Sequence, residues 1–125
     1  MKKCVFCDIK DKNNYIIENW GAFAVKDSYP VTKGHTLVIS RRHEEKFFDL
    51  PPSEQTDLLK LAARVKERLQ LNDATIDGFN IGINIGKSAG QTVPHVHIHI
   101  IPRRQGDCKD PTGGVRGVIP EKQAY

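Results

Sequence analysis

The segment His95-Val96-His97-Ile98-His99-Ile100-Ile101-Pro102 decides the fold and holds the most reactive side chains of the chain. Its three histidines occupy alternate positions, with aliphatic residues between them. A period of two is that of a β-strand, in which successive side chains point to opposite faces. On a strand the three imidazoles therefore share one face, with neighbours roughly 6.6 Å apart, and the aliphatic side chains share the other face.

Packing alone does not readily explain such a row of imidazoles. Each buried ring would need hydrogen-bond partners for two nitrogens, whereas a single histidine among aliphatic residues is commonly structural. Two functional interpretations are open: a metal site and phosphoryl chemistry with a histidine nucleophile. The spacing by itself does not separate them.

Length and composition indicate an ordinary globular protein. The chain has 125 residues, of which 38% are hydrophobic and 27% charged, so we expect a single domain over residues 1–125. The formal net charge of +4 suits an anionic ligand, but the basic residues are too scattered to indicate nucleic-acid binding. No apolar run approaches the roughly 20 residues of a membrane span, and no signal-peptide core follows Met1. We therefore expect a cytoplasmic protein that binds neither nucleic acid nor membrane.

Several elements can be predicted around the histidine strand. Short strands are expected at residues 15–20 and 22–25, followed by a central strand at 35–40 that is apolar on both faces. One long helix should begin at Pro52, because proline suits the first helical position, and should end near Gln70. Its apolar stripe has helical spacing and consists of Leu58, Leu61, Ala62, Val65 and Leu69.

Residues 79–85 alternate between apolar and polar and predict a further strand. The connector 86–94 is too short for a crossover helix, so this strand should pair antiparallel with the histidine strand. Both would turn aliphatic side chains to the long helix, which places Asn84 beside the histidines. From Arg103 to Tyr125 we expect irregular chain that packs on a neighbour or over the site.

The chain begins with a second motif, Cys4-Val5-Phe6-Cys7. In a reduced compartment this pattern is a redox motif, half of a zinc site, or two unrelated cysteines. The third cysteine, Cys108, stands alone in a polar loop. A zinc ion would therefore need two further ligands, and histidines are the available ones.

The long, ordered pattern of these residues resembles the signature of the histidine triad (HIT) family. The resemblance rests on Asn84, residues 89–93 and the histidine segment, and it extends in order to residues 4–7, 32–39 and His43. Residues 48–50 and 90–93 resemble the fragile-histidine-triad branch, whose members hydrolyse dinucleoside polyphosphates. Residues 113–120 resemble small prokaryotic members.

The resemblance implies an α+β fold and a reaction. The fold is an antiparallel sheet of about five strands with one long helix and a short N-terminal helix, in a two-fold homodimer. In the reaction His97 attacks the α-phosphorus of an AMP- or GMP-type nucleotide, and water then cleaves the nucleotidyl-histidine. Three alternatives stay open: an adenosine phosphoramidase-type hydrolase, a nucleotide-binding regulatory protein with weak catalysis, and a metal-binding protein that uses the triad itself.

The resemblance also assigns roles to individual residues. His97 is the nucleophile, His99 holds phosphate oxygens, and His35 supports the nucleophile's strand as a fourth histidine. The implied substrate-binding residues are Asp27 at the ribose, Asn84, Gly90, Gln91 and Thr92 around the phosphates, and Phe6 and Ile9 as walls of the base pocket. A purely structural role is the alternative for His35 and Asp27, and core packing is the alternative for Phe6 and Ile9.

Some family members bind zinc through residues that match Cys4, Cys7, His43 and His95. Such a zinc ion would be structural, because four protein ligands close its coordination shell. His95 would then be unable to protonate the leaving group, and the proton donor stays open.

Overall fold

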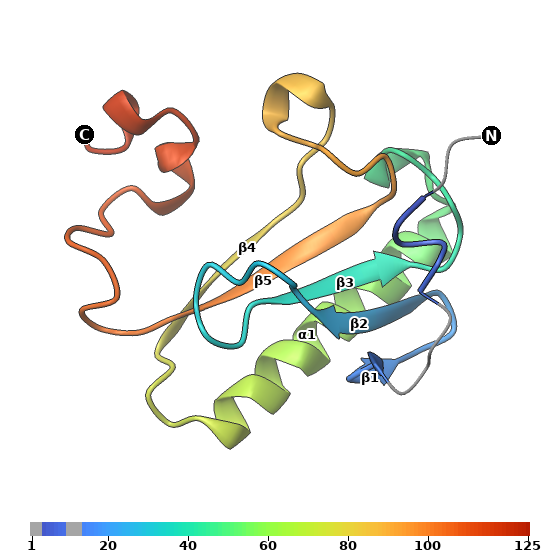
Figure 1. Ribbon diagram of the computed structural model, residues 1–125, viewed down its shortest axis with the longest axis horizontal. Helices are drawn as coiled ribbons and strands as arrows, with labels where there is room; N and C mark the ends of the chain where they lie inside the picture. Colours follow the sequence, from blue (N-terminus) through green and yellow to red (C-terminus); the bar gives the residue numbers. More distant parts are fainter. Residues whose placement is uncertain (1–3, 10–13) are drawn as a thin grey trace.

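The computed structural model describes residues 4–9 and 14–125. Five strands form one antiparallel sheet in the order β1-β2-β3-β5-β4, and the long helix α1 packs against one face of it (Figure 1). The strands are β1 (Ile17–Glu18), β2 (Ala22–Lys26), β3 (Thr36–Ser40), β4 (Gly78–Gly82) and β5 (His97–Arg103), and α1 runs from Pro52 to Asn72. The five-strand sheet and the single long helix confirm the predicted α+β class.

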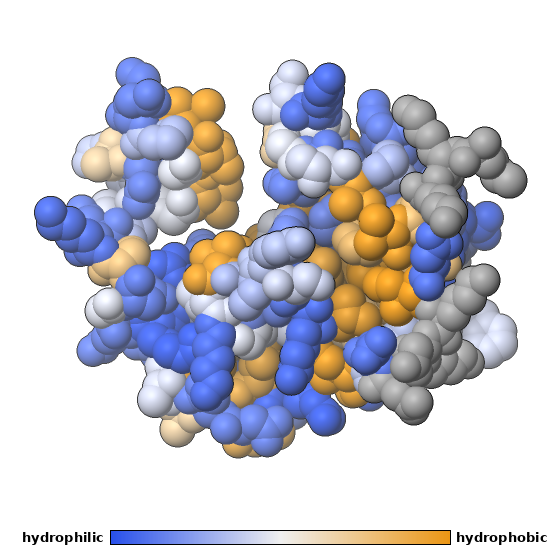
Figure 2. Space-filling model, in the orientation of Figure 1, coloured by the Kyte–Doolittle hydropathy of each residue, from blue (hydrophilic) through white to orange (hydrophobic). Residues whose placement is uncertain are grey.

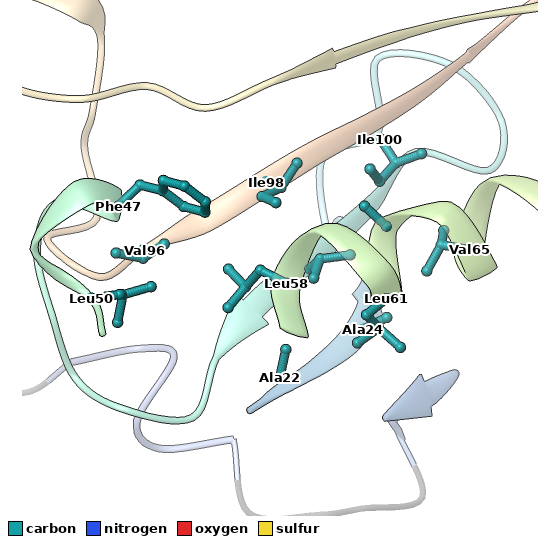
Figure 3. Close-up of a cluster of buried hydrophobic side chains, with 12 residues drawn as sticks. Ala22, Ala24, Phe47, Leu50, Leu58, Leu61, Val65, Val96, Ile98 and Ile100 are labelled. Carbon is teal, nitrogen blue, oxygen red and sulfur yellow. The ribbon is translucent and has the colours of Figure 1, made fainter. Parts of the chain in front are cut away.

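The side chains of strand β5 alternate between the two faces of the sheet. Its aliphatic side chains Ile98 and Ile100, with Val96 just before the strand, lie in the core cluster under α1 (Figure 3). On α1 the partners are the predicted stripe, of which Leu58, Leu61, Ala62 and Val65 are buried. The opposite face carries a second apolar cluster of Phe6, Phe23, Val25, Leu37 and Ile39, next to the histidines. The predicted alternation is therefore confirmed.

Helix α1 begins where the sequence indicates. Pro52 stands at its first position and Glu54 in its first turn, where a missing N–H costs nothing and a carboxylate is favoured by the helix dipole. The helix ends at Asn72, two residues beyond the predicted end at Gln70. The Asp73 N–H donates a hydrogen bond to the Leu69 carbonyl, which satisfies one of the last carbonyls of the helix.

Strand β4 pairs antiparallel with β5, as predicted, but it is shorter than the expected 79–85 and differs in burial. Ile81 is 45% exposed and Ile85 36%, although we expected both to face the helix. The reason is the position of β4 at the edge of the sheet, because α1 makes its main contacts with β2, β3 and β5. Only Phe79 and Ile83 of this series pack against the helix-side core.

The N-terminal prediction is only partly met. Residues 5–8 form a turn, closed by a hydrogen bond from the Asp8 N–H to the Cys4 carbonyl. The expected short N-terminal helix stays a prediction. Residues 10–13 lie outside the described part of the chain. Strand β1 is also shorter than predicted, since only Ile17 and Glu18 pair with β2.

The C-terminal tail, residues 107–125, stands off the body of the molecule (Figure 1) and turns an apolar side toward the β4–β5 connector across a gap (Figure 2). It contains two short 3₁₀ turns, Gly114–Val118 and Pro120–Lys122. Gln123 ties them together, because its side-chain amide donates to the carbonyls of Asp110 and Thr112. The tail therefore does not cover the histidine row of its own chain, which was one of the two expected placements.

Within the described residues, the helices are all too short or too polar to cross a lipid bilayer.

Replacement of Leu61 by alanine tests the assignment of the helix-side core. Leu61 is fully buried, and Leu→Ala in such a position costs about 2–5 kcal/mol of unfolding free energy. Leu71→Ala, on the same helix but 80% exposed, should change it by less than about 0.5 kcal/mol. Urea unfolding of both variants measures the difference. Equal losses would contradict the packing of α1 described here.

Candidate active site and metal centre

The nucleophile candidate His97 is held in one tautomer by its own strand. Its Nδ1 lies 2.8 Å from the carbonyl oxygen of His95. A carbonyl only accepts hydrogen bonds, so Nδ1 must carry the proton and Nε2 of the neutral ring keeps a free lone pair. The side chain is 8% exposed. This arrangement provides the unprotonated nitrogen that attack on phosphorus requires.

A chain of hydrogen bonds orients His99, the next histidine on the same face. The Val31 N–H donates to Nδ1 of His35, so the proton of a neutral His35 sits on Nε2. That Nε2 lies 3.0 Å from Nδ1 of His99. If His99 accepts there, its own proton is on Nε2, and the ring presents an N–H donor suited to a phosphate oxygen. His97 and His99 are neighbours, with ring centroids 5.1 Å apart.

Asp27 joins this chain of hydrogen bonds from the end of β2. Its Oδ2 lies 3.3 Å from Nε2 of His35, and its Oδ1 accepts the Tyr29 N–H. Asp27, His35 and His99 lie close enough together to hold a cation. The proton on Nε2 of His35, imposed by Val31, points into that space and disfavours a metal there. We therefore interpret these residues as a hydrogen-bonded support for His99.

Burial favours the neutral form of His35, His95 and His99 by lowering the pKa of each. Burial is the main cause of the lowered pKa of His35 and of His99. The neighbouring histidines lower the pKa of His99 further, whereas Asp27 opposes the shift of both residues. Burial lowers the pKa of His95 as well, although its hydrogen bond to the Ser40 carbonyl opposes this. A neutral imidazole is the form that can attack phosphorus or bind a metal.

Four side chains from three separate segments form a second constellation. They are Cys4 and Cys7 from the N-terminal turn, His43 from the residues after β3 and His95 from the residues before β5. Their possible ligand atoms all lie within 4.8 Å of one another. Nδ1 of His95 is 3.4 Å from Sγ of Cys4 and 3.5 Å from Sγ of Cys7. Nδ1 of His43 is 3.1 Å from Sγ of Cys7 and 3.2 Å from Nδ1 of His95.

These distances fit a tetrahedral zinc site. With Zn–S near 2.3 Å and Zn–N near 2.0–2.1 Å, tetrahedral angles place a sulfur and a nitrogen ligand roughly 3.5 Å apart and two nitrogens roughly 3.3 Å apart. The tautomer fits as well, because Nε2 of the buried His95 lies 2.7 Å from the Ser40 carbonyl and must donate to it. Nδ1 of His95 is therefore unprotonated and available to a metal. Cys108 is exposed and outside the set.

The β4–β5 connector holds the remaining predicted residues, and the structure gives them different surroundings. Gln91 does not point to the histidines: its amide donates to the Glu45 and Val93 carbonyls and accepts the Gly86 N–H, so it pins the connector. Gly90 has φ +92°, which favours glycine. Its position adjoins the amide of Asn84. Thr92 is exposed.

Phe6 and Ile9 both lie on the histidine face. Phe6 is 9% exposed and belongs to the second apolar cluster, with Ile9 packed against it. The ring of Phe6 meets His97 edge-on at 4.9 Å between centroids. Core packing, one of the two expected alternatives, is therefore observed for Phe6, and its ring also lies beside His97.

The histidine row reaches the protein surface at its His99 end. Two surface hollows of about 380 Å³ and 300 Å³ lie elsewhere, the first between β4, β5 and the tail and the second over α1 and β1. His99 is half-buried at the surface. A ligand at this face would therefore lie across the sheet, beside Phe6 and Asp27.

A model of the HIT domain matches residues 10–106. The chain belongs to the histidine triad (HIT) family. An uncharacterized HIT-like protein of Mycobacterium tuberculosis is 41% identical over 110 residues, which cover 83% of this chain and 74% of that protein. Family membership implies a nucleotide ligand.

Two enzymes of the HIT family are similar to this chain. The asymmetrical bis(5'-nucleosyl)-tetraphosphatase of Schizosaccharomyces pombe is 46% identical over 81 residues, covering 65% of this chain and 44% of the enzyme. The adenosine 5'-monophosphoramidase of Saccharomyces cerevisiae is 36% identical over 104 residues, covering 81% and 63%. The family therefore includes hydrolases of phosphoanhydride and of phosphoramidate bonds.

A zinc-bound HIT protein of Mycobacterium smegmatis is similar in structure. Its crystal structure matches with a TM-score of 0.76 and 37% identity, over 87% of this chain and 84% of that protein. This likeness bears out the HIT fold, and the presence of zinc in that protein agrees with the four-ligand cluster found here.

Several contacts of the site carry no side-chain signal in the sequence. The carbonyls of Ser40 and His95 and the N–H of Val31 set the tautomers of three histidines, and any residue type provides these groups. The contact between Asp27 and His35 was also missed, because we placed Asp27 at a ribose. The seven residues that separate them form a loop, which the sequence indicates only as a break in regular structure.

Lowered histidine pKa values predict a loss of stability in acid. The unfolded chain has histidine pKa values near 6.5, above those of folded His35 and His99, so it binds more protons once the pH falls below about 6.5, and the free energy of unfolding decreases. We expect His35→Gln to make this decrease shallower between about pH 7.5 and 5.5, measured by urea unfolding. The variant keeps all four zinc-ligand candidates, so acid release of metal is common to both proteins. An equal pH dependence of the unfolding free energy in both proteins would contradict a lowered pKa of His35.

Proposed function

We propose that this HIT protein hydrolyses nucleotides by transferring a nucleotidyl group to Nε2 of His97. The observation that carries the proposal is the hydrogen bond from His97 Nδ1 to the His95 carbonyl, because it leaves Nε2 unprotonated at the point where a nucleophile is needed. The substrate that we favour is a dinucleoside polyphosphate of the diadenosine type, with an AMP- or GMP-type group transferred.

The reaction balances in two steps. The Nε2 lone pair of His97 forms a bond to the α-phosphorus, and the bridging P–O bond to the leaving phosphate chain breaks with its electron pair. A water oxygen then attacks the same phosphorus and gives up a proton to solvent, the N–P bond breaks with its electron pair returning to Nε2, and a nucleoside monophosphate is released. An N–H donor on His99 would stabilise charge on the non-bridging oxygens in both steps, with His35 and Asp27 fixing its ring.

The substrate-binding residues follow from the same placement. We place the backbone of Gly90 and the neighbouring amide of Asn84 at the phosphates, together with the hydroxyl of Thr92. Gln91 supports this region by pinning the connector to Glu45. Phe6 and Ile9 offer an apolar wall for the base, and the carboxylate of Asp27 can bind ribose hydroxyls with the oxygen lone pairs left by Tyr29 and His35.

Similarity to a phosphoramidase supports one alternative. The yeast phosphoramidase aligns over more of this chain than the fission-yeast tetraphosphatase does, although at lower identity. A phosphoramidate would react through the same His97 attack, with an amine in place of the phosphate chain as leaving group. A regulatory role with weak catalysis would use the same nucleotide-binding residues.

We further propose a structural zinc ion held by Cys4, Cys7, His43 and His95. The distances among the ligand atoms of these four residues and the tautomer of His95 support this set of ligands. When bound, the ion would link the N-terminal turn to the ends of β3 and β5. Because His95 would be a ligand, another group would have to protonate the leaving group.

A two-fold homodimer is the assembly that we propose. Strand β4 is an edge strand with an exposed isoleucine, Ile81. Free edges with apolar side chains are commonly covered in the native assembly. Pairing with a second copy would cover both.

Removal of the nucleophile tests the proposed function. We expect His97→Ala to lower the hydrolysis of diadenosine tetraphosphate and of an AMP amide by roughly 10³-fold or more, with Cys108→Ser as a control of unchanged activity. Quenching wild-type turnover in alkaline denaturant and measuring intact mass should reveal one added nucleotidyl group on His97. Turnover by His97→Ala at the wild-type rate would refute the role of His97.

Elemental analysis tests the zinc site. Purified wild-type protein should contain about one zinc per chain, whereas Cys4→Ser should contain much less. Cys108→Ser, which changes an exposed cysteine outside the cluster, should keep the wild-type content. Zinc-free wild-type protein after expression in zinc-supplemented medium, or equal content in both variants, would count against the site.

A further inference from the structure

Phe6 lies between the histidine row and the cysteine–histidine cluster, to which the proposed function gives separate roles. It is the third residue of Cys4-Val5-Phe6-Cys7, so its backbone is fixed wherever the two cysteines are fixed. Its ring meets His97 edge-on at 4.9 Å, with an angle of 75° between the planes. The same ring meets His95 at 5.9 Å and 81°. One buried side chain thus contacts both the nucleophile and a ligand candidate.

A second contact connects the same two sites. His97 owes its tautomer to the carbonyl of His95, and the ring of His95 is held by Ser40 on one nitrogen and by the cysteine–histidine cluster on the other. The Val96 N–H of the same peptide unit donates to the Glu44 carbonyl, so this backbone contact and the ring of His95 together hold that carbonyl in place. Loss of the hydrogen bond would let the proton of His97 move to Nε2 and remove the lone pair.

The N-terminal turn depends on the cluster for its position. The described contacts that hold residues 4–9 to the sheet are the packing of Phe6 and Ile9, a hydrogen bond from the Tyr15 hydroxyl to the Ile9 carbonyl, and the approach of the two cysteines to His43 and His95. These four residues would hold a zinc ion, which would add a further connection because the ligands come from three segments.

We infer that Phe6 is a positioning residue for His97, and that through Phe6 and the His95 carbonyl the binding of zinc and the binding of a nucleotide strengthen each other. The inference rests on the proposed function for the location of the nucleotide and on the proposed zinc site. Coupling of this kind is reciprocal, so the factor by which a nucleotide tightens zinc binding equals the factor by which zinc tightens nucleotide binding.

Competition with a chromogenic chelator measures the coupling without any turnover. The zinc dissociation constant of the wild-type protein is determined with and without saturating AMP. We expect AMP to lower it by at least about fivefold. In Phe6→Leu the ratio should fall close to one. A ratio of one in the wild-type protein, including the case in which AMP does not bind, overturns the inference.

Phe23→Leu is the matched control. Phe23 is a phenylalanine of similar burial in the same apolar cluster, but it stacks on Tyr15. It should keep the wild-type ratio, and thermal unfolding of both variants checks that they fold. If Phe23→Leu loses the coupling as fully as Phe6→Leu does, the effect comes from general loosening of the face and the inference fails.

The tautomer of His97 gives an independent readout on zinc-loaded protein. Imidazole ¹⁵N NMR shifts should report a single Nδ1–H form in the wild type and in Phe23→Leu, and a mixture of tautomers in Phe6→Leu. An unchanged single tautomer in Phe6→Leu would overturn the positioning role, even if that variant binds AMP more weakly, because Phe6 would then act only as a wall of the base pocket.

These outcomes separate the inference from the function on which it rests. Coupling and a tautomer change in a protein that hydrolyses no nucleotide would leave the inference standing and refute the hydrolase. Turnover that requires His97, in a protein without coupling, would refute the inference alone.

Discussion

The pleat of β5 is the constraint on which the rest of the structure depends. Because side chains of a strand alternate between faces, the segment that provides Val96, Ile98 and Ile100 to the core under α1 must turn its histidines to the opposite face. Burial of the aliphatic side chains is favourable at about 25 cal/mol per Å² of apolar surface. A shift of register by one residue would put the imidazoles under the helix and the aliphatic residues at the surface. The stability of the fold and the geometry of the site are thus fixed by the same interaction.

Imidazoles on a largely buried face need partners, and these partners determine the chemistry. In the described part of the chain, each buried side-chain nitrogen and oxygen has a hydrogen-bond partner, as expected from the cost of leaving one unpaired. Four of the five histidines bond to groups that differ in character: a carbonyl for His97, a carbonyl and the cysteine cluster for His95, a backbone N–H for His35, and His35 for His99. Each partner selects a tautomer. The residue type is the same at every position, yet the rings are prepared for attack, for metal binding and for hydrogen-bond donation.

Most of the fold could be predicted because its signals are local. The alternation in β5, the stripe on α1 and the short β4–β5 connector are patterns of neighbouring residues, and they sufficed for the antiparallel pairing and for the side of the sheet that the helix covers. Errors arose where a longer-range fact decided. Ile81 and Ile85 have the pattern of a buried face but lie at the sheet edge, beyond the reach of α1. Gln91 was predicted at the phosphates, and only the tertiary structure shows that the carbonyl of Glu45 lies within reach of its amide.

The sequence by itself determined that three histidines share one face of a strand, opposite an aliphatic face that packs on a long helix. Those properties need only the geometry of a strand and of a helix. Tertiary structure alone decided which ring nitrogen of each histidine carries the proton, that Asp27 meets His35, and that Phe6 lies against His97. It also brought Cys4 to within 3.4 Å of His95, a residue 91 positions away in the chain. Such contacts depend on how separate segments dock against one another, and no local pattern of side chains encodes the position of a distant carbonyl or N–H.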